Sequence, residues 1–446
     1  MSERATKRFR ARWALAILPF LIGSEAVVAQ NECREDVEFA LRELESKCGH
    51  FFRTKGIDWR RVTSDVTKRA KRAKSLQDHF EVLVRLLAHL RDGHARVIPS
   101  DEKAELEWPG ERDTTGPGMF WCRIGKKVFV KNSFATAASS GVEDGMEILT
   151  VDGVKADKWL DGRVDALREF QSFSTEHQAR FFAMHQGLAR PAGTRMKLEL
   201  RSTNGKKSKR TITYDKASTV PDGPAFRPDG LTAAENIQFG RLASGFGYVH
   251  VRRCKSSLPE EFDRALAGLA DVPAMILDFR GNSGGGFDHD ALLGRFVPAG
   301  KTMQFAKSIP SSGPQPYGGP VVVIVDATVR SAGETASGMF KEDGRAYMIG
   351  ESPTAGMSAS KETLALPSGK FSLYFAVQSN KARYQGGRGI EGIGIEPHEL
   401  VEFEPDDLAS GRDTLIVRAE TLCAKFPQQK VPYDPTRFDW EPPTGR

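Results

Sequence analysis

The spacing of apolar residues predicts helices in the first part of the chain. Between residues 33 and 92, apolar side chains recur every three or four positions, as in "VEFALRELESKCGHFF" and "LQDHFEVLVRLLAHL", which is typical of amphipathic helices. The second stretch ends at "RDGH", where Gly93 is expected to be the left-handed residue that stops the helix. His94 therefore lies just past a helix end, before the strand-like "ARVI".

From about Met119 the period changes to two. "KKVFVKNSF", "TRMKLELRST" and "KRTITY" alternate apolar and polar residues, which predicts strands. The stretch from Leu160 to Arg190 is rich in Phe and His, and we interpret it as a helical insertion between these strands. "EWPGERDTTGPG" and "STVPDGPAFRPDGL" are rich in Gly and Pro and are predicted to be linkers on either side.

Beyond the second linker, strands and helices alternate, which favours an α/β core. "GFGYVHV", "AMILDFR" and "PVVVIVD" are nearly continuous apolar runs, typical of buried strands. The proline-rich tail, residues 426–446, is expected to be irregular.

The N-terminus has the pattern of a targeting segment. Five basic residues precede the apolar run "WALAILPFLIG" and the small residues of "AVVAQ", which predicts a signal peptide over residues 1–29 and a periplasmic or secreted protein. The apolar run is short for a bilayer span, so no integral membrane span is expected after processing; an uncleaved anchor is the alternative. Removing this segment, with five basic and two acidic residues, lowers the formal net charge from +6 to +3. So small an excess does not favour nucleic-acid binding.

Five cysteines remain after this removal, and export would permit disulfides. An odd number leaves at least one thiol unpaired within the chain. Cys33 and Cys48 bracket one helical segment and could pair with each other only if that helix is interrupted. No CxxC pair or His/Cys cluster has the spacing of a metal site, so neither a structural metal nor a cofactor is predicted.

Two stretches could carry chemistry. In "VRSAGETASGMF", Ser331 and Glu334 fit a capping box at a helix start, but a serine there is also near free N–H groups that could stabilise an oxyanion. In "AMILDFRGNSGGG", neither GxxxxGK[ST] nor GxGxxG is present, which disfavours a phosphate loop. Gly284 or Gly285 could instead bring a backbone N–H close to a reacting carbonyl. The polar residues of this loop are expected to hold its shape rather than contact substrate: Asp278, Arg280 and Asn282.

Part of the strand-rich region resembles a PDZ domain. The resemblance covers residues 115–216 and is carried by "SSGVEDGMEILTVDGVKADKW". PDZ domains bind the C-terminus of a peptide by adding it as a strand to an exposed edge. The alternative is that this domain only braces the active site.

The later motifs resemble one protease family. "DFRGNSGG", "SAGE", "PTAG" and "GIGIEPH", preceded by "IDWRRV" and "HLRDGHARV", follow the order of tail-specific (carboxy-terminal processing) proteases and the tricorn core protease, over residues 33–402. This resemblance implies an α/β, crotonase-like serine protease core at 230–425, an N-terminal helical segment at 30–110 and an inserted PDZ-like, β-rich domain at 115–216.

The resemblance also implies site residues. Ser331 would be the nucleophile, with Ala332 and either Gly284 or Gly285 as the oxyanion hole. Processing proteases use a lysine just after Thr-x-Gly as the base, but Met357 stands there, and a thioether cannot act as a base. Lys361 lies four residues further on.

The tricorn-type histidine matches His94, whose residue type suits general-base work near neutral pH. The matching glutamate is Glu391, with Glu396 as the next candidate. Gly93 stands where the tricorn pattern has a serine. We therefore expect an exported serine peptidase that cleaves polypeptides through an acyl-enzyme. The alternatives are a non-catalytic peptide-binding protein on a degenerate core and a Ser/Lys-type processing protease.

Overall fold

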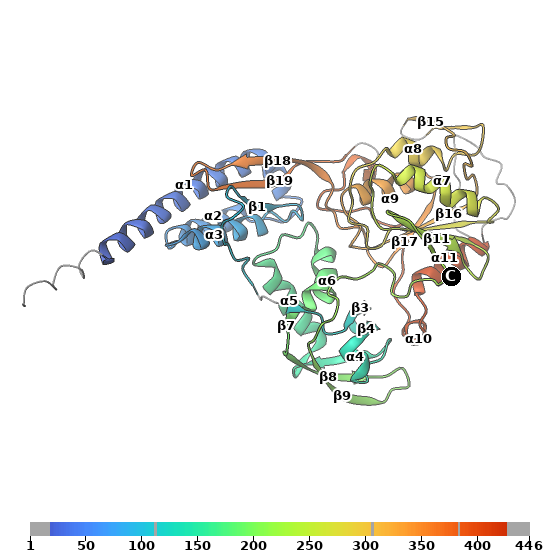
Figure 1. Ribbon diagram of the computed structural model, residues 1–446, viewed down its shortest axis with the longest axis horizontal. Coiled ribbons are helices and arrows are strands. Elements are labelled where there is room, and N and C mark those ends of the chain that lie inside the picture. The colour runs from blue at the N-terminus through green and yellow to red at the C-terminus, as the bar shows by residue number, and fades with distance from the viewer. Residues whose placement is uncertain (1–17, 111–113, 305–306, 382–383, 426–446) are drawn as a thin grey trace, which may run out of the picture.

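The chain folds into a mixed α/β protein. The computed structural model describes residues 18–110, 114–304, 307–381 and 384–425. Figure 1 shows an N-terminal helical unit, a β-rich unit and a larger sheet-containing core, in chain order. Most of the predicted signal peptide and the tail after 425 lie outside the described residues. Among the described helices, none is both long enough and apolar enough to span a membrane.

The N-terminal unit combines early and late parts of the chain. Its elements are α1 (Leu18–Phe52), α2 (Trp59–Ala70), α3 (Leu76–Ala88) and β1 (Arg96–Pro99). A hairpin of β18 (Ala359–Ala365) and β19 (Phe371–Ser379) pairs with β1 and lies alongside α1 (Figure 1). Phe371, Leu373 and Phe375 of the hairpin share one buried cluster with Leu44 and Leu83. The hairpin therefore carries the polypeptide from the core to the N-terminal helices and back.

The structure answers one open question about this unit and corrects one expectation. Cys33 and Cys48 both lie on the uninterrupted α1, and all five cysteines are buried free thiols. The expected helix stop at Gly93 is wrong. Helix α3 ends at Ala88, and the left-handed residue is Arg91, with φ of 48°.

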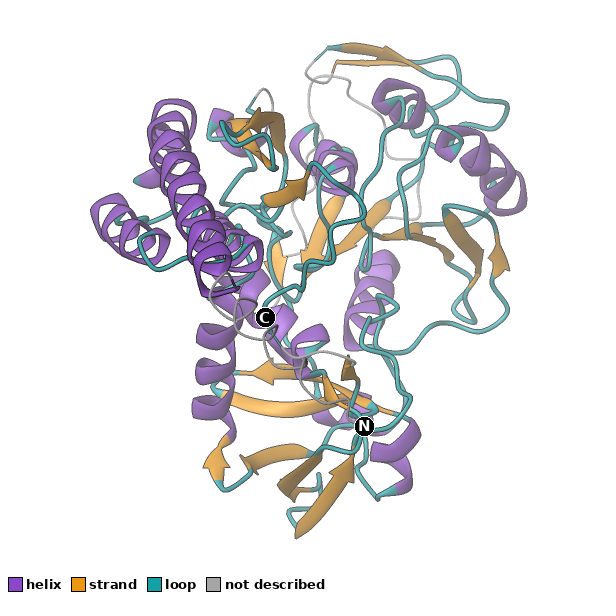
Figure 2. Cartoon of the chain, turned by 60° about the vertical axis from the view of Figure 1, so that its left-hand side comes forward, coloured by secondary structure: helices purple, strands orange, loops and turns teal. Residues whose placement is uncertain are grey.

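The β-rich unit contains an antiparallel sheet and the predicted helical insertion. The strand order is β3 (Met119–Ile124), β4 (Lys127–Ser133), β5 (Glu147–Val151), β8 (Arg195–Arg201) and β9 (Lys207–Thr213), with the short β6 (Val154–Lys155) beside β5. A second pair joins β2 (Thr114–Thr115) to β7 (Arg190–Pro191). Helices α4 (Ala135–Ser139), α5 (Ala156–Arg168) and α6 (Glu176–Met184) pack against strands of this sheet, and Figure 2 shows helices beside the strands in the lower part of the view. Trp121, Leu160 and Leu198 are among its fully buried residues.

The core is built on a seven-stranded sheet. Its order is β10 (Thr232–Ala233), β11 (Ile237–Arg241), β12 (Gly247–Val251), β13 (Met275–Asp278), β16 (Val321–Val325), β17 (Tyr347–Gly350) and β20 (Glu399–Leu400), parallel from β12 onward. The predicted buried strands β12, β13 and β16 are its centre, and every residue of each is buried.

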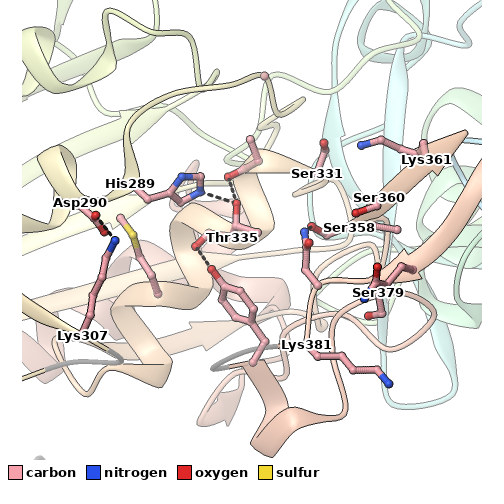
Figure 3. A pocket seen from close by; sticks show the side chains of 17 residues that line it. His289, Asp290, Lys307, Ser331, Thr335, Ser358, Ser360, Lys361, Ser379 and Lys381 are labelled. Carbon is pink, nitrogen blue, oxygen red and sulfur yellow. Dashed lines mark hydrogen bonds and ion pairs between the residues drawn. The ribbon is translucent and has the colours of Figure 1, made fainter.

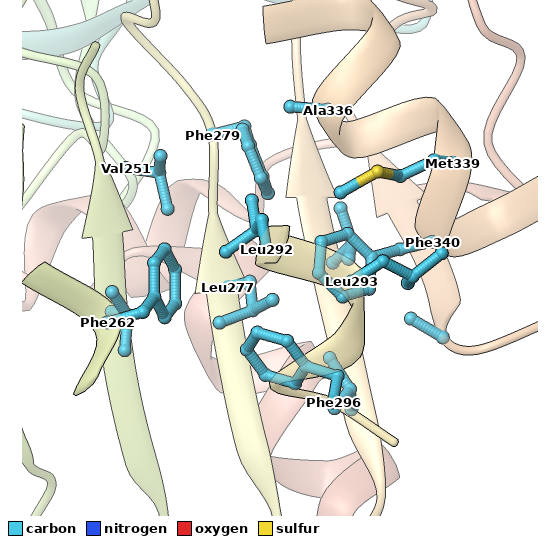
Figure 4. Close-up of a cluster of buried hydrophobic side chains, with 14 of the residues drawn as sticks. Val251, Phe262, Leu277, Phe279, Leu292, Leu293, Phe296, Ala336, Met339 and Phe340 are labelled. Carbon is cyan, nitrogen blue, oxygen red and sulfur yellow. The ribbon is translucent and has the colours of Figure 1, made fainter. Parts of the chain in front are cut away.

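Helices cover both faces of this sheet. On one face α7 (Leu258–Leu269), α8 (His289–Gly294) and α9 (Ala332–Glu342) pack with Leu277 and Phe279 (Figure 4). On the other, α11 (Thr414–Lys425) packs against Ile276 and Ile324, beside α10 (Pro405–Ala409). A small hairpin of β14 (Thr302–Gln304) and β15 (Ser308–Pro310) lies next to α8. The loops after β13 and β16 leave the same edge of the parallel sheet, where α/β proteins usually place their sites.

Candidate active site

Ser331 lies between the end of β16 and the start of α9. Its backbone has φ of 55° and ψ of −123°, a conformation that non-glycine residues rarely adopt and that is concentrated at functional sites. The Ser331 N–H donates to Glu334 Oε2 at 3.2 Å and to the Met357 carbonyl at 3.1 Å. The glutamate half of the predicted capping box is therefore formed. Ser331 also lines a cavity of about 700 Å³ (Figure 3).

The glycine loop after β13 lies against Ser331. A Cβ placed on Gly284 would come within 2.8 Å of the Ser331 Cβ, so only glycine fits there. The Gly284 N–H already donates to Asn282 Oδ1 at 2.8 Å. Gly285 and Ala332, by contrast, both line the cavity beside Ser331. The geometry therefore favours Gly285 over Gly284 as the partner of Ala332 in an oxyanion hole.

The expected structural role of the polar loop residues is confirmed. Arg280 is fully buried and makes ion pairs with Asp278 and with Asp413 at 2.6 Å and 2.9 Å. The Asn282 Nδ2 donates to the Val251 carbonyl at 2.8 Å. These contacts fix the loop to the sheet and to the chain before α11.

His94 and Glu391 come together at the junction of the units. The His94 side chain is 13% exposed, and its Nδ1 lies 3.8 Å from Asp92 Oδ1 and has no hydrogen-bond partner among the described residues. Glu391 Oε1 accepts from Lys55 Nζ at 2.8 Å and from Ser174 Oγ at 3.3 Å, whereas no group in the described ranges donates to its buried Oε2. One side-chain atom from each of Asp92, His94 and Glu391 lies within 4.8 Å of the other two. Two buried polar atoms that have no hydrogen-bond partner among the described residues thus belong to one cluster of side chains.

Burial controls the protonation of both groups. Burial lowers the pKa of His94 to about 4, Asp92 opposes the change, and the positive charge of Lys361 adds to it. Burial raises the pKa of Glu391 to about 7, and the Lys55 ammonium opposes that rise. His94 is therefore neutral over most of the pH range, while Glu391 changes charge near neutrality.

The segment 354–357 connects this pair to Ser331. Glu334 of α9 accepts from Thr354 Oγ1, Gly356 N and Met357 N at 2.6, 2.7 and 2.8 Å. The Gly392 N–H donates to the Gly356 carbonyl at 2.9 Å. The start of α9, the segment 354–357 and the loop containing Glu391 are therefore one hydrogen-bonded assembly.

The Met357 side chain fills the space beside Gly93. A Cβ on Gly93 would meet the Met357 Sδ at 2.5 Å. The residue before His94 and the residue whose carbonyl accepts from Ser331 are therefore in contact. No hydrogen bond joins the His94 ring to the Ser331 hydroxyl in the described part of the chain. Catalytic hydrogen bonds are often long in ligand-free enzymes and shorten when substrate binds.

Other candidates differ in their surroundings. Lys361 lines the same cavity as Ser331, and Figure 3 shows its ammonium on the side facing the serine. A lysine base therefore stays an alternative. His289 also lines the cavity, but its Nε2 is bonded to Thr335 Oγ1 at 2.7 Å. Glu396 lies at the surface, 3.7 Å from Arg388.

Three residues around Glu391 were not found from the sequence: Asp92, Lys55 and Ser174. Asp92 stands two positions before His94, and its carboxylate accepts from the His94 and Ala376 N–H groups, so a local signal existed. Lys55 and Ser174 reach Glu391 from other units, and no local pattern marks them. A cation could also lie among Asp92, His94 and Glu391, but Lys55 already neutralises Glu391, and we interpret the group as acid–base machinery.

Comparisons with known proteins found a matching family model and several relatives. Residues 245–401 match the family model of Peptidase family S41. A putative tricorn protease homolog 2 of Streptomyces coelicolor is 23% identical over 406 residues, covering 88% of this chain but 32% of that protein. A carboxyl-terminal-processing protease of a Picosynechococcus species is 22% identical over 350 residues, covering 74% of this chain and 75% of the relative.

The fold also has solved counterparts. The crystal structure of mature CPAF aligns over 89% of this chain and 98% of its own, with a TM-score of 0.66 and 13% sequence identity. This likeness concerns the fold. The predicted family resemblance and the predicted class, a serine-type peptidase, are confirmed. The roles of Ser331, His94, Glu391 and the oxyanion donors stay predictions.

Proposed function

Because this chain carries a peptidase domain of family S41, we propose that it is a serine peptidase with a Ser331–His94–Glu391 triad. Ser331 Oγ attacks the scissile carbonyl while His94 takes its proton, and an acyl-enzyme forms as the protonated imidazole gives that proton to the leaving amine. Water, activated by the same imidazole, then releases the acyl group. Glu391 orients the ring and stabilises its positive charge.

The observation that carries this proposal is that two buried atoms without hydrogen-bond partners belong to neighbouring residues. Within the described part of the chain His94 Nδ1 and Glu391 Oε2 have no hydrogen-bond partner, and one side-chain atom of each residue lies within 4.8 Å of the other. A small approach would form an Nδ1–H···Oε2 hydrogen bond, since buried polar groups strongly favour a partner. That bond leaves Nε2 as the proton acceptor, the tautomer that a serine nucleophile needs.

The oxyanion would lie between two backbone donors. The N–H groups of Gly285 and Ala332 belong to segments that line the cavity on either side of Ser331. Ala332 begins α9, so its N–H is at the positive end of a helix dipole. Removing one such donor typically slows acyl transfer about 100–1,000-fold.

A fluorophosphonate probe tests the proposal, because it labels only an activated serine. The folded protein should be labelled at Ser331, and Ser331→Ala should lose both labelling and peptide hydrolysis. Loss of the cap should cost only about 1 kcal/mol of stability, so this variant should remain folded. Ser360→Ala is the matched control, because Ser360 lines the same cavity. An unlabelled, folded wild-type protein would instead favour a non-catalytic peptide-binding protein.

The β-rich unit would present the substrate. We assign it as a PDZ-like domain over residues 115–216 that binds the C-terminal carboxylate of a polypeptide. The support is the "GMEILTVDG" sequence, which spans β5 and the turn to β6. Calorimetry with a peptide and its amidated form tests this, because equal affinity for both, or none for either, would rule out carboxylate capture.

The site of action would be outside the cytoplasm. The basic and apolar N-terminal residues support cleavage near Ala29, which would place the cut within α1. Sequencing the N-terminus of the protein purified from its natural host tests this. An intact residue 1 in a membrane fraction would favour the uncleaved anchor.

A further inference from the structure

We propose that Lys55 is a positioning residue of this centre, whose ammonium keeps Glu391 ionised and turned so that its second oxygen faces His94. This inference rests on the proposed triad. Lys55 does not touch the reacting atoms and would act only through Glu391.

The ion pair is completely enclosed. Lys55 Nζ lies 2.8 Å from Glu391 Oε1, and the two side chains are 1% and 0% exposed. Lysines are almost never this buried unless they are paired. Ser174 Oγ donates to the same Oε1 at 3.3 Å. Two donors therefore hold Oε1, and only Oε2 is left for the imidazole.

The Lys55 side chain occupies a space shaped for it. Gly392 follows Glu391 directly, and a Cβ there would come within 3.0 Å of Lys55 Cε and 3.1 Å of its Cγ. The Lys55 ammonium lies 4.7 Å from the centre of the Phe51 ring, a favourable cation–π distance. Arg91 Nη1 donates to the Lys55 carbonyl at 2.6 Å. The backbone, stem and head group of Lys55 are thus each fixed by a separate contact.

The charges around Glu391 make this contact necessary. Lys55 is the cation that faces Glu391, whereas Asp92 adds an unfavourable negative charge. His94 lies in the same cluster, and Glu334 interacts unfavourably with Glu391. The thiol of Cys48, which the Lys55 charge also influences, donates to the Ala376 carbonyl. Burial raises the pKa of Glu391 to about 7 even though Lys55 opposes the rise.

Without the Lys55 charge, the pKa of Glu391 would rise further, and the carboxyl would be protonated at neutral pH. A protonated carboxyl stabilises an imidazolium poorly, so catalysis would fail at neutral pH and recover as the pH is raised. A residue that only supported the fold would lower activity by the same factor at every pH.

The test compares Lys55→Met and Lys55→Gln with the wild-type enzyme across pH. We expect kcat at neutral pH to fall about 10–100-fold, with the acid limb of the profile shifted to higher pH in both variants. Lys55→Arg should restore part of the activity and the original limb, because it restores the charge. Lys47→Met is the matched control: Lys47 is on α1, the helix that ends three residues before Lys55, pairs with Glu362 at 2.8 Å and is 34% exposed. A Lys55→Met enzyme with an unshifted profile would overturn the proposal.

A readout independent of activity separates this inference from the proposed function. Infrared difference spectra should show a new protonated-carboxyl band in Lys55→Met at neutral pH, absent from Lys55→Met/Glu391→Gln. That double variant, in which neither partner of the ion pair carries a charge, should fold and be no less active than Glu391→Gln. Absence of the band would refute the role of Lys55. If Lys55→Met shows the band but the wild-type protein has no peptidase activity, the role of Lys55 is supported and the proposed function is refuted.

Discussion

At the scale of single residues, the central question is which group takes the proton from Ser331. His94 has an unsatisfied ring nitrogen near a carboxylate, whereas Lys361 borders the cavity that Ser331 lines. We expect His94→Ala to reduce turnover by several orders of magnitude, since general-base and triad effects reach about 10,000-fold. Lys361→Ala should change turnover little.

The measurement is turnover of one peptide substrate by both variants. His289→Ala is the control for loss of an imidazole that borders the cavity. An inactive Lys361→Ala beside an active His94→Ala would reassign the chain to the Ser/Lys mechanism, with a displaced lysine.

The pH dependence of activity belongs to the same scale. The pKa of Glu391 is raised to about 7 and that of His94 is lowered to about 4. Activity should therefore fall as the pH drops through about 7, because Glu391 gains a proton while His94 is still neutral. Glu391→Gln should lower the maximal rate and remove the fall in activity near pH 7, so that activity declines only near the pKa of His94, about 4. A limb that persists near 7 in Glu391→Gln would assign it to another group.

At the scale of elements, two residues that differ from the motifs of the similar proteases lie against each other. Gly93 stands where the tricorn pattern has a serine, Met357 stands where processing proteases have a lysine, and the Met357 thioether fills the space beside Gly93. Gly93 and Met357 have to be considered together, because their contact joins the loop after α3 to the segment 354–357. The expected helix stop at Gly93 is wrong because α3 already ends at Ala88 and Arg91 takes the positive φ, whereas Gly93 lies against the Met357 side chain.

This contact predicts a paired mutational effect. Gly93→Ser should reduce turnover at least about 10-fold, since it displaces Met357 or moves His94, and misplacement of about 1 Å is enough for larger losses. Gly93→Ser with Met357→Ala should recover most of the activity by making room for the serine. Kinetics of the two single variants and the double variant check this, and additive losses would show that the two sites are independent.

At the scale of the whole molecule, the sequence predicted local features better than connections between units. The strands β12, β13 and β16 were predictable because each has its own apolar run, and Ser331 because it follows such a run. The hairpin β18–β19 was not assigned to the N-terminal helices, since no local pattern shows that Phe371 packs with Leu83. Lys55 could not be predicted for the same reason: its partner Glu391 lies 336 residues further along the chain.

A second buried ion pair connects the β-rich unit to the core. Lys131 of β4 lies 2.8 Å from Glu351, which follows β17, with side chains 3% and 12% exposed. Asp326, at the start of the loop leading to Ser331, is fully buried, and burial raises its pKa to about 6 while Lys131 opposes the rise. One lysine of the β-rich unit therefore compensates two carboxylates on the nucleophile side of the core.

Removing Lys131 should lower the free energy of unfolding of the protein. Lys131→Met leaves Glu351 without its paired cation and removes one of the two cations, with Arg280, that oppose the pKa rise of Asp326; breaking a buried pair typically costs about 3–5 kcal/mol. Lys127→Met is the control on the same strand, because Lys127 is 59% exposed and 3.5 Å from Glu147; such pairs contribute at most about 1 kcal/mol. Denaturant unfolding measures both. Equal midpoints for the two variants would mean that the β-rich unit and the core are not joined through Lys131, and that Asp326 is stabilised from within the core.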